Sequence, residues 1–297
     1  MTEAKANPKT AAGTGSSPTF IVAVEQFFPK GERLIQDNFA LQILPFGLRT
    51  FAHLLRIPML RNWMIRASEK QISGGWSAFP VRKRYIDEKI VGEVDSGQVD
   101  AIVNLGAGFD TRVYRLPALS KVPVWELDQA VNLDTKEKRI VSIFGKIPPH
   151  VTLARINFQE EEIASVLKSH GYQENTKTFF IWEAVSQYLS EDAVRATFDF
   201  LSQAKTGSQL AFTYVLKDFI EGKNFYGEEA FYQRMVVNQK AWYFGWNPEQ
   251  LADFLAEYGW RLIEDAGYEE LNQRYTKSTG RNFSSMIIER VAYAEKL

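Results

Sequence analysis

The chain has 297 residues, a hydrophobic fraction of 45% and a formal net charge of −1 at pH 7. This length allows a large buried core, and a charge near zero gives no general attraction for nucleic acid or an anionic membrane. The chain has no cysteine, which excludes disulfides, catalytic thiolates and cysteine-bound zinc. Its three histidines show no metal-binding spacing, and no basic patch is interleaved with aromatic residues. We therefore expect no metal and no nucleic-acid partner.

Residues 1–18 are rich in Ala, Thr, Gly, Ser and Lys and contain no apolar stretch of the kind found in secretory signals. This composition predicts a disordered tail, and the missing signal favours a cytoplasmic protein. Residues 19–297 are expected to form one domain, with a helical cover over 19–95 and an α/β core over 96–297.

Two prolines, Pro45 and Pro58, divide the apolar part of the cover and predict short helices at about 46–57 and 59–70. Arginines recur among the large apolar residues here, a pattern that also fits a helix lying on a membrane surface. We prefer the interpretation that these helices cover a substrate site. Contact with a membrane surface is the less favoured interpretation. Arg56 is a candidate to grip a substrate carboxylate, although a solvated charged face is the simpler explanation.

The most informative stretch joins a short apolar run, residues 101–105, to the turn Gly106-Ala107-Gly108. The run has the length and β-branched content of a buried parallel strand. Glycines directly after a strand let the backbone approach a ligand and direct amide groups toward it. This pattern indicates a nucleotide-binding turn.

The residues after the turn distinguish between cofactors. A dinucleotide fingerprint would place Gly or Ala at position 111, but this chain has Thr111, preceded by Asp110. A carboxylate beside a diphosphate is unfavourable, whereas S-adenosylmethionine has no phosphate and carries a sulfonium cation. Asp110 is otherwise explained as a helix cap and a brace for the loop.

The sequence of residues 105–116, LGAGFDTRVYRL, resembles the first motif of the leucine carboxyl methyltransferase family. That family groups S-adenosylmethionine-dependent O-methyltransferases that act on carboxyl or hydroxyl groups, including relatives that methylate polyketides and other small molecules. Further matches follow in order over roughly residues 80 to 290. Together with the alternation of strands and helices, the resemblance implies an α/β class I methyltransferase fold. We expect a Rossmann-like seven-stranded sheet whose last strands are residues 260–264 and 284–294, the final one antiparallel.

The segment Arg82-Lys83-Arg84 is similar to an Arg-Thr-Arg-like segment of the family. The resemblance implies that Arg82 pairs with the methionine carboxylate of the cofactor, where a planar guanidinium can make two contacts. Lys83 departs from the usual Thr, which leaves the register of the two arginines open.

A second predicted strand, residues 122–127, ends beside Asp128. A carboxylate about 20 residues beyond a glycine turn is the group that holds ribose hydroxyls in nucleotide-binding folds. Asp128 also matches the acid of the family's Glu-x-Asp motif. Glu126 is expected to be structural and to brace Arg115.

A third strand is predicted over residues 150–158. The family usually ends it with an Asp that accepts a hydrogen bond from the adenine amino group, and this chain has Asn157 there. An amide oxygen can accept the same bond. The resemblance therefore implies that Asn157 and Phe158 contact adenine.

The fourth predicted strand, residues 178–182, leads into Glu183 and a segment that resembles the family's Glu-Gly-Val-x-x-Tyr-Leu, with Ala184 in place of Gly. At the carboxyl end of a strand, Glu183 is expected to face the cofactor and neutralise its ammonium or sulfonium group. Ser190 is expected to cap the next helix. Tyr188 belongs either to the core or to the substrate wall.

Tyr214, at the end of a fifth strand predicted over residues 209–214, is a candidate to lie near the methyl acceptor. An insertion at about 217–247 is dense in aromatic residues, which suit an apolar acceptor pocket. Tyr243 and Trp246 are its candidate contacts. The same residues would equally suit a separate small core or a dimer interface, so the chain is expected to be a monomer or a homodimer.

We therefore expect an S-adenosylmethionine-dependent O-methyltransferase, with S-adenosylhomocysteine as product and a small, largely apolar carboxylate or acidic hydroxyl compound as acceptor. No catalytic residue is assigned, because an ionised carboxylate needs no general base. A protein C-terminal carboxyl methyltransferase would use the same cofactor site. The alternatives from other classes are an NAD-dependent oxidoreductase and a non-catalytic protein that binds membrane surfaces.

Overall fold

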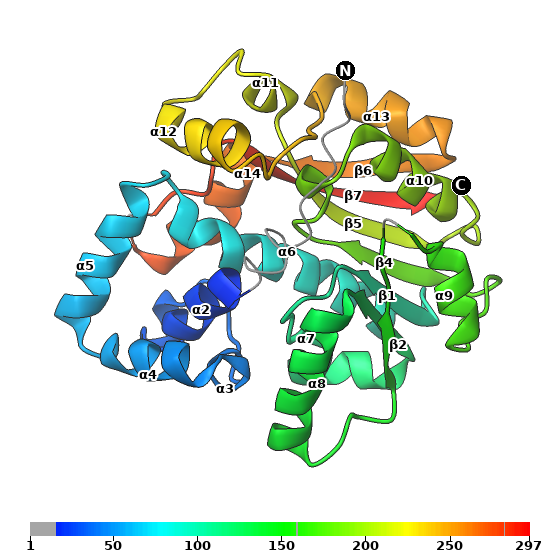
Figure 1. The fold of residues 1–297 in the computed structure, drawn as a ribbon, viewed down its shortest axis with the longest axis horizontal. Helices are drawn as coiled ribbons and strands as arrows, with labels where there is room; N and C mark the ends of the chain where they lie inside the picture. Colours follow the sequence, from blue (N-terminus) through cyan, green and yellow to red (C-terminus); the bar gives the residue numbers. More distant parts are fainter. Residues whose placement is uncertain (1–15, 159, 282) are drawn as a thin grey trace.

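The computed structural model describes residues 16–158, 160–281 and 283–297, and its centre is a seven-stranded sheet (Figure 1). The strand order is β3-β2-β1-β4-β5-β7-β6. Strands β1 to β5 pair in parallel, and β7 runs antiparallel to both of its neighbours, β5 and β6. The predicted fold, with its last strand antiparallel, is confirmed. The strands are β1 Ala101–Leu105, β2 Val124–Asp128, β3 Val151–Arg155, β4 Thr178–Trp182, β5 Gln209–Val215, β6 Trp260–Ala266 and β7 Glu289–Lys296.

Helices fill the connections and precede the sheet. Those before β1 are α2 Ser16–Glu25, η1 Lys30–Glu32, α3 Ala40–Ile43, α4 Phe46–Leu54, α5 Pro58–Glu69 and α6 Gly75–Asp95. Those between β1 and β5 are α7 Arg112–Arg115, η2 Pro117–Lys121, α8 Ala130–Phe144, α9 Ile163–Ser169, η3 Ser186–Tyr188 and α10 Glu191–Ser202. After β5 come α11 Lys217–Ile220, α12 Glu229–Tyr232, the π-helix η4 Gln233–Asn238, α13 Pro248–Glu257, α14 Tyr268–Leu271, the π-helix η5 Asn272–Thr276 and η6 Lys277–Thr279.

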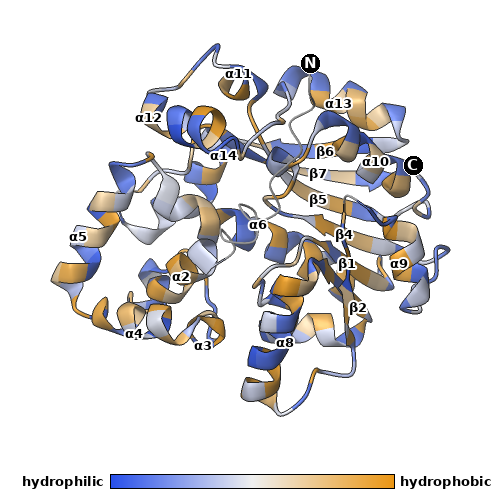
Figure 2. Ribbon diagram, viewed as in Figure 1, coloured by the Kyte–Doolittle hydropathy of each residue, from blue (hydrophilic) through white to orange (hydrophobic). Residues whose placement is uncertain are grey.

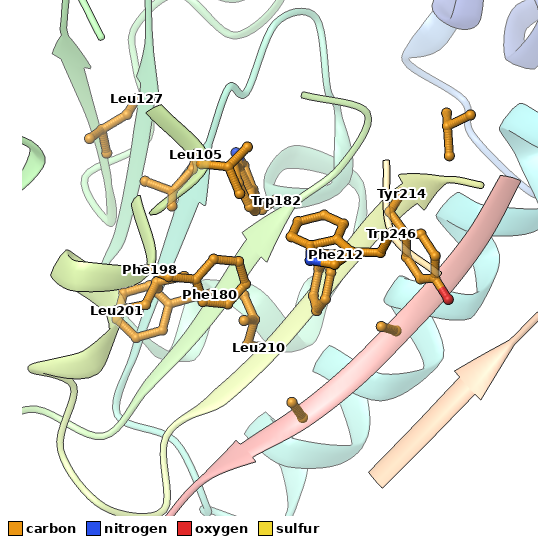
Figure 3. Packing of buried hydrophobic residues seen from close by; sticks show 14 of the residues in the cluster. Leu105, Leu127, Phe180, Trp182, Phe198, Leu201, Leu210, Phe212, Tyr214 and Trp246 are labelled. Atoms are coloured by element: carbon orange, nitrogen blue, oxygen red, sulfur yellow. The ribbon is translucent and has the colours of Figure 1, made fainter. Parts of the chain in front are cut away.

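The central strands β1, β2, β4 and β5 are buried along their whole length, whereas the outer strands have residues that are partly exposed. In β1, Val103 belongs to a core cluster shared with α9, α10 and α13, whereas Ile102 belongs to one shared with α6. Successive side chains of a strand point to opposite faces, so these helices cover opposite sides of the sheet. Figure 3 shows the first cluster, in which Trp182 of β4 packs edge-to-face against Phe198 of α10.

The helices before β1 form a third apolar cluster beside the sheet, with α2 packed against α3, α4 and α6 (Figure 1). Helix α2 begins at Ser16, within the segment that composition predicted to be a tail. The remainder of that prediction, residues 1–15, lies outside the described residues. Helices α4 and α5 occur close to where Pro45 and Pro58 placed them.

The last strand is shorter than predicted, because β7 begins at Glu289 rather than at residue 284. The backbone just before β7 makes its hydrogen bonds with side chains and not with a neighbouring strand. The amide of Ser285 donates to the side chain of Asn272 in η5, and the carbonyl of Ser284 accepts from the hydroxyl of Ser77 in α6. With their backbone groups used in this way, these residues do not join the sheet.

Candidate functional site

A cavity of about 520 Å³ lies where the carboxyl ends of β1, β2 and β4 meet the helical cover. Parallel strands direct these ends to the same edge of the sheet, which is where ligands bind in open α/β folds. All the residues predicted to hold the cofactor line this cavity: Arg82, Gly106, Ala107, Gly108, Asp128, Asn157, Phe158 and Glu183. The structure thus brings together side chains that are up to 101 positions apart.

The turn after β1 depends on glycine. Gly106 has φ +77° and Gly108 has φ +43°, in the left-handed region that favours glycine. A Cβ at Gly106 would lie 2.4 Å from Cγ2 of Val185, so a side chain here would displace the segment after β4. The amides of Gly106 and Ala107 both donate to the carbonyl of Leu127, at 2.9 Å each, which fixes the turn against β2.

Asp128 closes β2 and is held by three hydrogen bonds. Its Oδ2 accepts from the amide of Gly108 at 2.6 Å, and its Oδ1 accepts from the amide of Gln129 and from Nδ2 of Asn132, both at 2.7 Å. Burial raises the pKa of this carboxyl above its usual value, against the effect of these hydrogen bonds. Asp128 is therefore a fixed acceptor at the cavity wall.

Arg82 of α6 connects the cover to the sheet. Its Nε donates to Oε1 of Glu183 at 2.9 Å, and its Nη1 donates to Oε1 of Glu289 at 2.6 Å. Its Nη2 makes no hydrogen bond with the residues that the structure describes. Burial alone would lower the pKa of Arg82, but the two carboxylates outweigh it and raise this pKa.

Glu183, just after β4, is the centre of a buried ion network. Besides Arg82, it accepts from Nη2 of Arg112 at 2.6 Å and pairs with Nζ of Lys83 at 3.3 Å. Burial acts to raise the pKa of Glu183, but the Lys83, Arg112 and Arg82 charges lower it to about 2. Glu183 is therefore a stable anion and a poor proton acceptor near neutral pH.

Asp110 belongs to the same network. Its Oδ1 accepts from the amide of Arg112 at 3.0 Å, and its Oδ2 lies 3.2 Å from Nε of that arginine. Burial would raise the pKa of Asp110, yet the Arg112 and Lys83 charges hold it well below its usual range. Asp110 thus braces the loop before α7, a helix of four residues whose N-cap residue is Thr111.

The expected contact between Glu126 and Arg115 is absent among the described contacts. Glu126 instead accepts from Nζ of Lys136 at 2.7 Å and from the hydroxyl of Tyr114 at 2.8 Å. Arg115 pairs with Asp87 at 2.5 Å. The prediction was wrong because α8, which carries Lys136, lies beside β2 and supplies a nearer cation.

The predicted substrate contacts divide into two groups. Tyr188 and Tyr243 line the cavity, but Tyr214, Trp246 and Arg56 do not. Tyr214 is buried in the core and its hydroxyl donates to Asp265 of β6 at 2.8 Å.

Trp246 and Arg56 each pack against an aromatic ring outside the cavity. Trp246 packs edge-to-face against Phe212, with ring centroids 5.6 Å apart. Arg56 is exposed in the connection between α4 and α5, and its guanidinium lies over the ring of Phe27. The predictions for Tyr214, Trp246 and Arg56 are therefore corrected.

Several cavity residues had no individual signal in the sequence. Arg234, Met235, Lys240 and Trp242 of the insertion line it, with Gln187 after β4. The insertion is fixed there by the amide of residue 243, which donates to the carbonyl of Gln187 at 2.7 Å. Aromatic density indicated a pocket wall, but the cations depend on the path of a π-helix that periodicity does not reveal.

Two of these side chains carry buried polar atoms. Nε1 of Trp242 and Oε1 of Gln187 are buried, and neither makes a hydrogen bond with a described residue. Buried polar groups almost always have a partner. Both atoms are enclosed in the protein and have almost no surface open to the cavity, so they are not counted among its ligand-binding groups.

In the described part of the chain, no group of three or more His, Asp or Glu side chains is arranged to hold a metal ion. None of the helices in residues 16–297, as described, is long and apolar enough to cross a membrane.

The sequence of this chain matches the family model described as "Leucine carboxyl methyltransferase" over residues 17–202. The match covers more than half of the chain. The chain belongs to the leucine carboxyl methyltransferase family. The predicted family and the predicted class of enzyme, a methyltransferase, are thereby confirmed.

Two proteins of Mycobacterium marinum illustrate the similarity within curated sequences, and both are named "Putative S-adenosyl-L-methionine-dependent methyltransferase". One is 29% identical over 202 residues, which are 65% of this chain and 64% of the relative. The other is 25% identical over 263 residues, which are 85% of this chain and 84% of the relative.

Two solved structures share the fold. A crystal structure titled "putative methyltransferase" from Thermobifida fusca has a TM-score of 0.57 and 12% identity, and covers 92% of this chain and 97% of its own. A protein of the DUF574 family from Streptomyces avermitilis has a TM-score of 0.54 and 13% identity, over 78% of this chain and 88% of its own. At these identities the likeness concerns the fold alone.

Proposed function

We propose that the protein is an S-adenosylmethionine-dependent O-methyltransferase that methylates the carboxylate of a small, largely apolar molecule. The family supports methyl transfer. The observation that carries the choice of acceptor is a cavity wall on which Arg234 and Lys240 stand beside aromatic side chains.

The residues on the β1, β2 and β3 side of the cavity fit the nucleoside part of this cofactor. Gly106, Ala107 and Gly108 line the cavity, and the two glycines have positive φ values that let the backbone turn along its wall. Asp128 is an enclosed acceptor suited to ribose hydroxyls. Asn157 and Phe158 line the neighbouring wall and would contact adenine.

Arg82 and Glu183 would hold the amino-acid part. The free Nη2 of Arg82 suits a carboxylate. Glu183 keeps its charge at neutral pH, and this charge would offset the ammonium or the sulfonium. When bound, S-adenosylmethionine supplies an electrophilic methyl group whose departure leaves a neutral thioether.

The choice of a carboxylate acceptor follows from the groups that line the cavity. None of the described residues that line it is a histidine. Four carboxyls line the cavity among the described residues. Glu183 and Asp110 have lowered pKa values and are engaged by cations, so neither is suited to remove a proton from a hydroxyl group. Burial raises the pKa values of the other two, but Glu289 is paired with Arg82 and Asp128 is held by three hydrogen bonds. A carboxylate is already ionised near pH 7, and alignment alone then provides much of the rate enhancement.

The acceptor would be held by its charge and by its apolar body. Arg234 donates a hydrogen bond to Oε1 of Gln71 at 3.0 Å, which joins the insertion to the helical cover. Lys240 makes no ion pair with a described residue. Phe231 and Met235 provide an apolar wall. The indole of Trp242 packs edge-to-face against Phe231, and the guanidinium of Arg234 lies over the same ring, 4.9 Å from its centroid. Two cations in one apolar cavity favour a single anionic group on an apolar molecule.

The test is methyl transfer from labelled cofactor to a panel of apolar carboxylic acids, phenols of matched size and a peptide with a free C-terminus. We expect base-labile methyl esters of the small acids. Arg234→Gln and Lys240→Gln should raise KM for the acid about tenfold or more, as loss of a charged contact does, and leave S-adenosylhomocysteine affinity unchanged. Arg195→Gln on the exposed face of α10 is the matched control.

Exclusive methylation of phenols or of the peptide would contradict the acceptor class while leaving the cofactor assignment intact. Failure of the wild type to bind S-adenosylhomocysteine would contradict both.

A further inference from the structure

Helices α4 and α5 expose an apolar surface that the methyltransferase site does not use. Its large side chains include Phe46, Met59 and Trp63, which are 84%, 75% and 68% exposed. We call this surface the α4–α5 patch, formed by Phe46, Phe51, Leu54, Ile57, Met59, Leu60 and Trp63. Single exposed apolar residues are normal, but seven within 18 consecutive positions mark an interaction site.

Within each of the two helices, patch residues share a helix face. Phe51 and Leu54 are three positions apart in α4, and Met59 and Trp63 are four positions apart in α5, so each pair shares a helix face. Ile57 lies in the short connection between the helices. Figure 2 shows α4 and α5, with orange segments, at the outer left edge of the molecule.

The charge around the patch is of one sign. Residues 38–68 contain four arginines and neither Asp nor Glu, although the whole chain has a net charge of −1. Arg56 and Arg66 are exposed and make no ion pair with any described residue. The arginines that are tied down in this stretch, such as Arg61, donate to backbone carbonyls instead of carboxylates.

We propose that the α4–α5 patch binds the surface of an anionic membrane. Interfacial helices combine an exposed apolar face with Arg or Lys beside it, and large apolar side chains insert at the boundary of headgroups and acyl chains. Unpaired arginines add attraction to anionic headgroups. A protein partner would need complementary acidic side chains arranged to fit, whereas a lipid surface requires only the two features seen here.

The patch also lies close to the proposed methylation site along the chain. Helix α5 carries Trp63 near its middle and Ser68 at its end, and Ser68 lines the cavity. An acceptor with an apolar body would therefore be available at the surface to which the enzyme binds. This link is additional, because binding to vesicles does not require the methyltransferase function.

The test is sedimentation of the full chain, without cofactor, with vesicles of phosphatidylcholine alone or mixed with phosphatidylglycerol. We expect binding to the anionic vesicles that weakens as salt rises. Met59→Ser/Trp63→Ser should weaken it at least about tenfold through lost apolar insertion. The matched control is Val131→Ser/Ile263→Ser, which changes two exposed apolar residues on α8 and β6 and should leave binding unchanged.

Trp63 provides a direct probe, because the other six tryptophans are buried. Acrylamide should quench wild-type fluorescence less when anionic vesicles are present, and Trp63→Phe should remove this difference but retain binding. Arg56→Gln/Arg66→Gln should reduce binding to anionic vesicles specifically.

Three results would overturn the proposal. They are no binding by the wild type, equal binding by Met59→Ser/Trp63→Ser, and a wild-type dimer that this variant converts to a monomer while neither form binds vesicles. The last result would make the patch an interface between two copies of the chain. Thermal unfolding of each variant shows whether the fold is intact. We expect it to be intact, because the substituted side chains are exposed.

Discussion

The main-chain N–H of Gly108 donates a hydrogen bond to Oδ2 of Asp128 at 2.6 Å. This bond joins the turn after β1 to the end of β2, so the glycine turn and the carboxylate proposed to bind ribose are held together. Oδ1 of Asp128 is held separately by Asn132 and by the next amide. The orientation of the carboxylate is thus set before any ligand binds, which reduces the entropy cost of binding.

Asp128→Asn is expected to weaken S-adenosylhomocysteine binding by about 1.5–3 kcal/mol, the usual loss for a hydrogen bond to a charged group. The amide has the size of the carboxylate but only one accepting oxygen. Calorimetric titration measures the change. Asp134→Asn, in an exposed pair with Arg155, is the control and should bind normally. Unchanged affinity in a folded Asp128→Asn protein would assign the ribose to another acid.

Tyr214→Phe separates the core from the site. The hydroxyl of Tyr214 donates to Asp265, so its loss should lower the free energy of unfolding by about 1 kcal/mol while acceptor kinetics stay unchanged. Tyr243→Phe should change the acceptor kinetics and leave the free energy of unfolding nearly unchanged, because Tyr243 lines the cavity. Urea unfolding and methyl-transfer assays distinguish the two. A Tyr214→Phe variant with full stability and poor activity would return Tyr214 to the acceptor site.

The parallel strands and the residues at their ends were predictable from sequence, because each signal is local. The runs 101–105 and 178–182 are apolar and bounded by turn or polar residues, and they are the observed β1 and β4. Once parallel order is known, their carboxyl ends must meet at one edge. Residues such as Gly108, Asp128 and Glu183 then gather at that edge without any knowledge of side-chain contacts.

The acceptor side was less predictable because it depends on long-range packing. Tyr214 lies near the end of a strand, as do the residues predicted to bind the cofactor. Only the tertiary structure shows that its hydroxyl donates to Asp265 and does not reach the cavity. Lys240 lines the cavity and has a positive φ of +46°. No local sequence pattern around it predicts this backbone conformation. Lys136 beside Glu126 likewise required knowledge of how α8 lies against β2.

The charge of Glu183 gives a pH-dependent contribution to stability. Its pKa is about 2 in the folded protein and about 4.3 in an unfolded chain. Because the folded value is the lower, the contribution is complete above the unfolded value and is lost as pH falls from about 4.3 toward 2. Buried carboxyls with raised pKa values, such as Asp87, act in the opposite direction, so total stability alone is not diagnostic.

Comparison with Glu183→Gln isolates the effect, since the other carboxyls are present in both proteins. The difference in unfolding free energy should be largest above about pH 5 and shrink as the pH falls below about 4. Urea unfolding across this range measures it. Glu191→Gln, in an exposed pair with Arg195, should show only a small, nearly constant difference. A Glu183→Gln difference that stays constant with pH would contradict the depressed pKa.

Ala184→Gly is expected to stabilise the protein. Ala184 has φ +58° in the segment where the family usually has glycine, and its amide donates to Oγ1 of Thr213 at 2.8 Å, which holds this conformation. The left-handed region costs an L-residue roughly 1–2 kcal/mol, and the extra entropy of glycine in the unfolded chain offsets roughly 0.5–1 kcal/mol of that. A net gain of up to about 1 kcal/mol should appear in urea unfolding. The control, Ala252→Gly in the exposed middle of α13, should lose about 1 kcal/mol. If both substitutions destabilise equally, the strain at Ala184 is already relieved by its surroundings.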